Sequence, residues 1–225
     1  MRDHEGHDRA WAEADARDKR RGRGRRARRA RRRVGVAAPG NVLVRTTRRE
    51  DVPAVVGLIG EVAAEGRWIL TEAPIEEKRL SELITASLEG ETGTALVAEA
   101  EEAIVGNLGL HAAGPDSVWL GMSVARGWRG RGVGSALLEA ALDWACGRGF
   151  RQVSLEVFPH NEAAISLYRK FGFVESERLR ERYRRRNGEV WDALVMTRSL
   201  EPTAGVAPKP KQARRPARGG PASEK

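Results

Sequence analysis

The alternation of apolar and polar residues divides the middle of the chain into strands and helices. Alternating or continuous aliphatic runs predict strands at 42–47, 94–100, 103–111, 117–124 and 152–157. Apolar residues spaced three and four positions apart predict helices from Asp51 onward and over 74–88, 132–146 and 162–170. Asn187-Gly188 is typical of a tight hairpin turn and predicts two closing strands. These elements predict one folded domain over residues 41–201.

The order of the elements predicts an α/β fold with one mixed sheet and helices packed on it. A strand at 117–124, a helix at 132–146 and a strand at 152–157 can form a right-handed parallel crossover. The short turns between the other strands add antiparallel pairs. The helix at 162–170 then leads into the closing hairpin.

Charge is distributed unevenly between this domain and the two ends of the chain. The formal net charge of the 225 residues is +9, and residues 17–33 hold eleven arginines and one lysine against one aspartate. We expect 1–40 to be a disordered Arg-rich tail and 202–225 a disordered basic tail rich in proline and alanine, because little in them is apolar. The Arg-rich tail is either a solvated segment or a non-specific contact for nucleic acid.

Composition limits the other classes of protein. Every apolar run is shorter than the roughly 20 residues that span a bilayer, and the N-terminus lacks the apolar stretch of a secretory signal. Cys146 is the single cysteine, which excludes an intramolecular disulfide and a site of several cysteines for a metal. We therefore expect a cytoplasmic protein with no membrane association and no metal.

A glycine-rich segment joins the strand at 117–124 to the helix at 132–146. It reads Arg129-Gly130-Arg131-Gly132-Val133-Gly134 and is followed by Ser135. Glycines allow the main chain to approach a ligand, and N–H groups at a helix start attract an anion. The two arginines add full positive charges. The segment predicts a diphosphate site, and a plain strand-to-helix turn is the alternative.

Two common nucleotide-binding patterns do not fit this segment. The P-loop pattern requires Lys followed by Ser or Thr after the glycines, and neither pair is present. The dinucleotide pattern GxGxxG requires a third glycine at the position of Ser135.

The spacing Arg129-x-x-Gly132-x-Gly134 instead resembles the acetyl-CoA diphosphate motif of the GNAT superfamily of N-acetyltransferases. Residues 155–173, which begin Leu-Glu-Val-Phe-Pro-His-Asn, resemble the second motif of that family. The resemblance covers about 43–200. It implies a mixed, mostly antiparallel sheet that splays between two parallel strands and is flanked by helices.

The resemblance also implies a role for each matching residue. The backbone of Met122, Ser123 and Val124 would pair with the pantetheine arm of acetyl-CoA, the co-substrate. Asn161 would contact that co-substrate near its thioester, and Tyr168 would protonate the leaving thiolate. The alternatives are a helix cap for Asn161 and a core aromatic for Tyr168. The residues that would hold the diphosphate are Arg129, Gly130, Arg131, Gly132, Val133, Gly134 and Ser135.

The implied reaction is direct transfer of the acetyl group to a primary amine within a ternary complex. Glu72 is a candidate for the general base or for an amine-binding group, and an ordinary loop acid is the alternative. Glu156 is a further candidate, because its strand borders the implied cofactor cleft. His111 is expected to be structural.

The acceptor implied by the closing strands is a small amine or an amino-acid-like compound. A protein N-terminus, such as that of a ribosomal protein, is the alternative acceptor. A third hypothesis is a catalytically inactive protein that contacts nucleic acid through 17–33. A homodimer is left open, because dimers are common in the family.

Overall fold

The computed structural model describes residues 36–38, 41–89 and 93–200. Apart from 36–38, the two predicted tails lie outside the described residues. The strands are β1 Val36–Ala38, β2 Val42–Thr46, β3 Gly93–Ala100, β4 Ala103–Ala112, β5 Ser117–Val124, β6 Gln152–Val157, β7 Val174–Arg184 and β8 Val190–Ser199. The helices are α2 Val52–Ala64, α3 Glu77–Glu89, α4 Val133–Gly147 and α5 Glu162–Lys170, with short 3₁₀ turns at Arg49–Asp51 and Arg126–Trp128.

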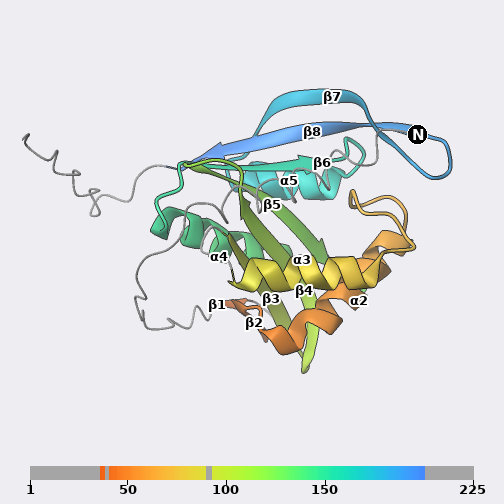
Figure 1. Cartoon of the computed structure of the whole chain (residues 1–225). Helices are drawn as coiled ribbons and strands as arrows, with labels where there is room; N and C mark the ends of the chain where they lie inside the picture. The colour runs from red at the N-terminus through yellow and green to blue at the C-terminus, as the bar shows by residue number, and fades with distance from the viewer. Residues whose placement is uncertain (1–35, 39–40, 90–92, 201–225) are drawn as a thin grey trace, which may run out of the picture.

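The described strands form one sheet in the order β1–β2–β3–β4–β5–β6–β8–β7 (Figure 1). All neighbouring strands are antiparallel except β5 and β6, which are parallel. This confirms the predicted mixed sheet, with α4 as the crossover between its two parallel strands.

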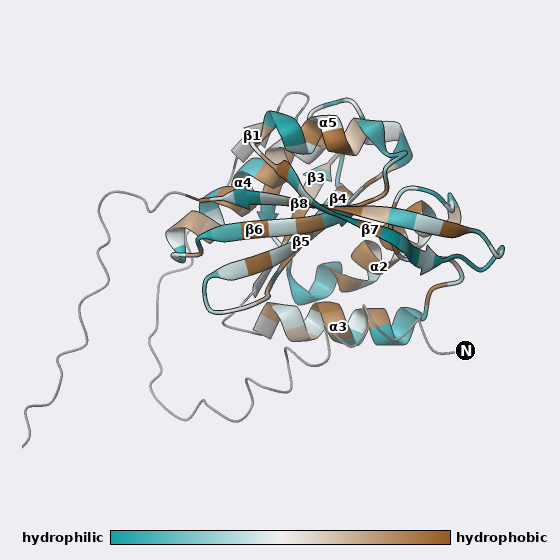
Figure 2. Cartoon of the chain, turned by 90° about the horizontal axis from the view of Figure 1, so that it is seen from above, coloured by the Kyte–Doolittle hydropathy of each residue, from teal (hydrophilic) through white to brown (hydrophobic). Residues whose placement is uncertain are grey.

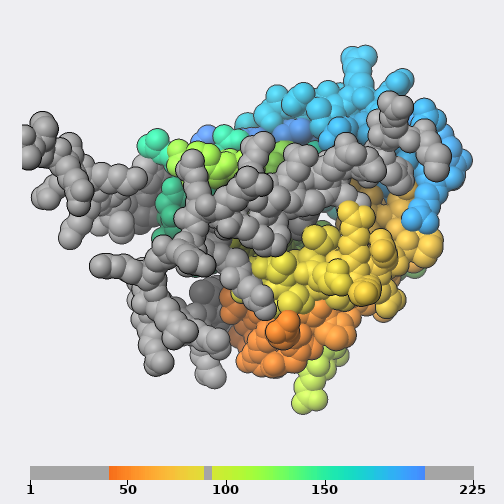
Figure 3. Space-filling model, viewed as in Figure 1, coloured from red at the N-terminus to blue at the C-terminus, as the bar shows by residue number. Residues whose placement is uncertain are grey.

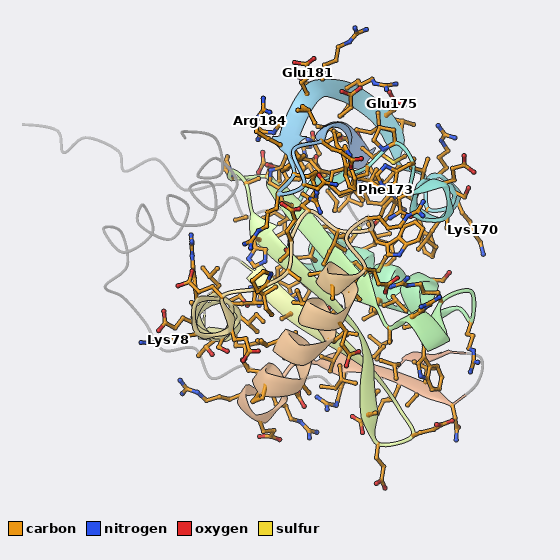
Figure 4. The ribbon with its side chains drawn as sticks, turned by 90° about the vertical axis from the view of Figure 1, so that its right-hand side faces the viewer. Lys78, Lys170, Phe173, Glu175, Glu181 and Arg184 are labelled. Atoms are coloured by element: carbon orange, nitrogen blue, oxygen red, sulfur yellow. The ribbon has the colours of Figure 1, made fainter. Side chains whose placement is uncertain are left out.

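Helices cover both faces of the sheet. Seen from above, α4 and α5 lie on one side of it and α2 and α3 on the other (Figure 2). The core lies mainly between the sheet and α4, whose buried residues include Leu137, Leu138 and Ala145. Phe173, between α5 and β7, points into the domain, whereas Glu175, Glu181 and Arg184 project outward from β7 (Figure 4).

Two regions differ from the sequence prediction by more than one residue. The helix predicted over 74–88 begins at Glu77, because residues 74–76 belong to a loop that packs on the hairpin, where the Pro74 carbonyl accepts a hydrogen bond from Arg186 at 3.4 Å. Val36–Ala38, within the stretch expected to be a tail, form β1 and pair with β2.

The two parallel strands separate partway along their length. Pairing joins Ser117–Trp119 to Gln152–Ser154 and then stops, although both strands continue. Each keeps its outer partner along the separated part, β4 for β5 and β8 for β6. The result is a gap between β5 and β6 at their carboxyl ends, which the resemblance had implied.

Candidate active site

The glycine-rich segment turns the chain from the open end of β5 into α4. Gly130 and Gly132 have positive φ angles of 73° and 86°, a conformation that favours glycine. Gly132 is the N-cap of α4 and forms no side-chain cap. The N–H groups of the first helical turn therefore have no acceptor within the helix and suit an anion, which the helix dipole also attracts.

Close packing places this helix start beside the gap. A Cβ added at Gly134 would lie 3.0 Å from Leu167 Cδ2 and 3.5 Å from Met122 Cε. The start of α4 therefore touches both β5 and α5, the helix that carries Tyr168. An acyl-CoA fits these groups, with its diphosphate at an uncapped glycine turn and its arm along an unpaired strand edge.

The three residues of β5 that were predicted to bind pantetheine do not all turn their backbone groups to the gap. The N–H of Ala113 donates to the Ser117 carbonyl, and the N–H of Ala125 donates to the Val105 carbonyl. Because backbone groups alternate sides along a strand, Ser123 bonds toward β4, whereas Met122 and Val124 turn their N–H and C=O groups to the gap. The Ser123 side chain is buried.

All three guanidinium nitrogens of Arg129 donate to protein groups. Its Nε donates to the Val124 carbonyl at 3.0 Å, and its two terminal nitrogens donate to the Glu65 carboxylate at 2.8 and 2.6 Å. This pairing holds the pKa of Glu65 below its usual value. Arg131, in contrast, extends over the ring of Trp128, with its guanidinium carbon 5.3 Å from the ring centre.

Tyr168 is buried on the face of α5 that packs against the sheet. It retains 6% exposure and lies against Phe173, with ring centres 5.8 Å apart. Its hydroxyl forms no hydrogen bond within the part of the chain that the structure describes. Burial raises the pKa of Tyr168 to about 12, so the phenol stays protonated near neutral pH and can donate a proton.

Asn161 caps α5, which was the structural alternative to a cofactor contact, and it also makes a second contact. Its Oδ1 accepts the Ala164 N–H at 3.3 Å and caps α5. Its Nδ2 donates to the Trp68 carbonyl at 3.2 Å. Asn161 therefore holds the loop that follows α2, and its predicted cofactor contact is untested.

Glu72 lies in that same loop and faces arginines. Its Oε1 is 3.2 Å from Arg185 Nε and accepts the Arg186 N–H at 3.2 Å. The Arg185 side chain is only 3% exposed and lies between the rings of Phe158 and Trp191, with centres 5.2 and 4.6 Å from its guanidinium carbon. Sequence reasoning missed Arg185, because it lies in an ordinary-looking basic run.

Glu156 stands on β6 beyond the point where pairing with β5 ends. The Tyr183 hydroxyl donates to its Oε2 at 2.5 Å, and burial together with this bond raises the pKa of Tyr183. Among the described residues Glu156 forms no ion pair, unlike Glu65 and Glu72. Glu156 therefore lies on a strand that borders the gap, and its carboxylate is held by a phenol of β7 and not by a cation.

A hollow of about 360 Å³ opens between the loop after α2 and the β7–β8 hairpin. Figure 3 shows this hairpin, in blue, against the orange-yellow segment that follows α2. The hollow is lined by Gly66, Arg67, His160, Asn187, Glu189 and Trp191.

Metal sites, membrane-spanning helices and the single cysteine bear on other kinds of function. They contain no group of three or more His, Cys, Asp or Glu residues that could hold a metal ion. None of their helices is long and apolar enough to cross a membrane. Cys146 is a half-buried free thiol on α4 that packs against the core.

A glycine-rich helix start beside two splayed parallel strands is the arrangement that the resemblance to the GNAT superfamily implied. Comparison with known proteins agrees, because residues 63–173 match the Acetyltransferase (GNAT) family. This match over 63–173 confirms the resemblance that the sequence predicted.

Individual relatives support the family assignment over different spans. An L-amino acid N-acetyltransferase of Escherichia coli (strain K12) is 40% identical over 80 residues, which cover 35% of this chain and 48% of the relative. The chain thus spans about half the length of this curated relative.

Two solved structures are matched over nearly their whole length. A ribosomal-protein-alanine N-acetyltransferase from Brucella melitensis is 25% identical with a TM-score of 0.65, over 70% of this chain and 99% of that one. A putative acetyltransferase from Salmonella typhimurium, solved with its cofactor acetyl-CoA, is 20% identical with a TM-score of 0.64, over 75% of this chain and 99% of that one.

Proposed function

We propose that this protein transfers the acetyl group of acetyl-CoA directly to a primary amine. The observation that carries the proposal is the divergence of β5 and β6 beside the uncapped start of α4. The diphosphate would be held by main-chain N–H groups of residues 130–135, with Arg131 adding charge. The pantetheine arm would pair with the backbone of Met122 and the N–H of Val124, which face the gap. A neighbour of the same fold was solved with acetyl-CoA, which supports this co-substrate.

In the proposed reaction the neutral amine nitrogen attacks the thioester carbonyl carbon. The carbon–sulfur bond then breaks, and the Tyr168 hydroxyl gives its proton to the departing thiolate. A free backbone N–H of β5, at Met122 or a neighbour, would stabilise the charge that develops on the carbonyl oxygen. Tyr168 suits this role because burial keeps its pKa at about 12 and its hydroxyl forms no bond to another described residue.

Glu156 is the better candidate for the base that takes the proton of the amine. A carboxylate whose oxygen is already engaged by an arginine and a backbone N–H is less available to an incoming amine. Glu72 faces Arg185 and the Arg186 N–H, which favours a role in holding its loop. Glu156 lies on β6, which borders the gap, and among the described residues its carboxylate receives only the Tyr183 hydroxyl. The role of Glu72 as base, predicted from sequence, stays a prediction.

For the acceptor we propose a small amine or amino-acid-like compound. The similar protein of Escherichia coli is an L-amino acid N-acetyltransferase, and a hollow of about 360 Å³ has the size of a small-molecule site. The alternative acceptor is a protein N-terminus, which is favoured by the similarity to a ribosomal-protein-alanine N-acetyltransferase.

Thiol release from acetyl-CoA, measured across a panel of amines and amino acids, tests this proposal. We expect Tyr168→Phe to lower kcat by about 10²–10⁴-fold, the usual contribution of a general acid, with little change in the Kd of acetyl-CoA. Glu156→Gln should lower kcat/KM most at low pH, where the amine needs a base, and Glu72→Gln should act mainly on KM.

Cys146→Ala serves as a control, since direct transfer needs no acyl-enzyme. A near-complete loss of turnover in this variant would indicate a covalent route instead. Absence of measurable affinity for coenzyme A would remove the enzyme assignment altogether.

A further inference from the structure

The segment between α2 and α3, residues 65–76, is called the acceptor loop below. Its first residue is bound directly to the glycine-rich segment, because Glu65 receives both terminal nitrogens of Arg129 at 2.8 and 2.6 Å. The same carboxylate accepts the Trp68 Nε1–H at 2.7 Å. Glu65 therefore links the acceptor loop to the segment that follows β5 and fixes the side chain of Trp68.

The first half of the acceptor loop is also held at the start of α5. The Trp68 carbonyl accepts a hydrogen bond from Asn161 Nδ2 at 3.2 Å, and the Arg67 carbonyl lies 2.7 Å from His160 Nε2. The Trp68 ring lies below two guanidinium groups, 4.4 Å from that of Arg67 and 5.8 Å from that of Arg129. Two of the residues that the family resemblance assigns to the cofactor, Arg129 and Asn161, both bind this loop.

The second half of the acceptor loop binds the β7–β8 hairpin. Arg185 donates to the Leu70 carbonyl at 3.1 Å and pairs with Glu72, and Arg186 binds Glu72 and Pro74. These bonds fix the position of the acceptor loop relative to the hairpin, which lies across the hollow from it.

The acceptor loop forms one wall of the hollow, through Gly66 and Arg67. The opposite wall comes from the hairpin residues Asn187, Glu189 and Trp191. Gly66 and Arg67 lie between Glu65 and Trp68, both of which are fixed by the pairing with Arg129. A shift of Glu65 therefore moves the wall that would contact an acceptor.

Arg129 ties this wall to the gap between the strands. Its Nε holds the Val124 carbonyl at the open end of β5, and its other edge holds Glu65. The guanidinium thus faces the protein, while the main-chain N–H groups at the start of α4 stay uncapped.

We propose that Glu65 is a positioning residue, which acts through Arg129 to hold the acceptor loop where it forms one wall of the acceptor site. The proposal rests on the proposed function, since it takes the hollow as the acceptor site. Glu65 fixes acceptor affinity and contributes little to cofactor affinity, because the diphosphate is held by main-chain groups.

Glu65→Gln in the full chain tests this role, with Glu61→Gln as the matched control. Glutamine keeps the size of the side chain and removes its charge. Glu61 lies one turn earlier on α2 and is exposed. We expect Glu65→Gln to raise the KM of the best acceptor about tenfold, with kcat and the calorimetric Kd of acetyl-CoA changed by less than about twofold, because one charge-assisted pair is lost. Glu65→Asp should recover part of the loss, and Glu61→Gln should behave as wild type.

Hydrogen exchange gives a readout that needs no turnover. Amides of residues 66–70 should exchange faster in Glu65→Gln than in wild type or Glu61→Gln. Unchanged exchange and KM, or a loss carried entirely by the Kd of acetyl-CoA, would overturn the role of Glu65. If the wild-type chain acetylated no amine, the proposed function would fail and the acceptor role with it, even if exchange at 66–70 were faster.

Discussion

Arg129 and Asn161 each combine a predicted cofactor contact with an observed contact to the acceptor loop. Each lies where the family resemblance expects a cofactor contact, and each also holds the acceptor loop, at Glu65 and at the Trp68 carbonyl. Asn161 does so with Nδ2 while its Oδ1 caps α5. One amide side chain therefore carries a helix cap and a long-range contact, because it has a donor and an acceptor.

His111 is a residue whose burial has a measurable consequence. Burial lowers its pKa to about 4. The unfolded chain takes up this proton near pH 6.5, whereas the folded protein resists it until about pH 4. The stability contributed by neutral His111 is therefore fully present above about pH 6.5 and is lost as the pH falls toward 4.

We expect the free energy of unfolding of the wild type to fall by about 2–3 kcal/mol through this group between pH 7 and 4, since one pKa unit is about 1.4 kcal/mol. Urea unfolding of wild type and His111→Gln across that range measures it, and carboxylates common to both cancel in the comparison. Parallel curves for the two proteins would show that His111 does not titrate in this way.

At the scale of elements, the start of α4 depends on a backbone conformation. Gly132 has a φ of 86°, and an alanine there costs about 1–2 kcal/mol of strain. To relieve it the chain would rotate the N–H groups that face the gap. We therefore expect Gly132→Ala to weaken the binding of coenzyme A at least tenfold.

Gly127→Ala is the matched control for this prediction. Gly127 lies in the same connection, and a Cβ there would have nothing within 4 Å. Isothermal titration of coenzyme A into both variants decides the matter. Equal losses in the two would mean that the glycine conformation at residue 132 is not what the ligand requires.

The gap between β5 and β6 also results from how whole strands pair. Along the separated part β5 stays paired with β4, and β6 stays paired with β8. Along this part the backbone of each strand is hydrogen-bonded to its outer neighbour. The N–H and C=O groups of its inner edge can pair with a third, extended partner. An extended ligand that pairs with these edges as an added strand would fit such a gap.

At the scale of the whole molecule, charge and catalysis are separated along the chain. Residues 17–33 carry eleven arginines and lie outside the described residues, whereas the candidate site lies between 65 and 191. We expect deletion of residues 1–33 to leave acetyl transfer unchanged and to reduce non-specific RNA binding. Because phosphate neutralisation releases counterions, the RNA binding of the full chain should weaken steeply between about 50 and 200 mM salt.

Filter binding of RNA and thiol release, each measured on the full and the shortened chain, check this separation. Lost turnover in the shortened chain would tie the basic segment to the enzyme. RNA binding that persists after the deletion would assign it to the domain instead.

The local pattern of apolar residues was sufficient to predict most helices and strands of this protein. Apolar periodicity predicted α4 and α5 to within about two residues, since each helix buries one continuous stripe against the sheet. The glycine-rich turn was readable too, because positive φ angles leave few alternatives to glycine. The start of α3 was misjudged, since the loop before it packs on the hairpin, where the Pro74 carbonyl accepts a hydrogen bond from Arg186.

The pairings that shape the candidate site were decided by tertiary structure alone. Glu65 and Arg129 are 64 residues apart, and Leu70 and Arg185 are 115 apart. No local pattern encodes such contacts, because they arise only when β8 lies between β6 and β7 and brings the hairpin over the acceptor loop. The sequence by itself determined the elements and the anion-binding turn, whose chemistry is local. The fold decided which carboxylates meet arginines and which one, Glu156, is left beside the gap without a cationic partner among the described residues.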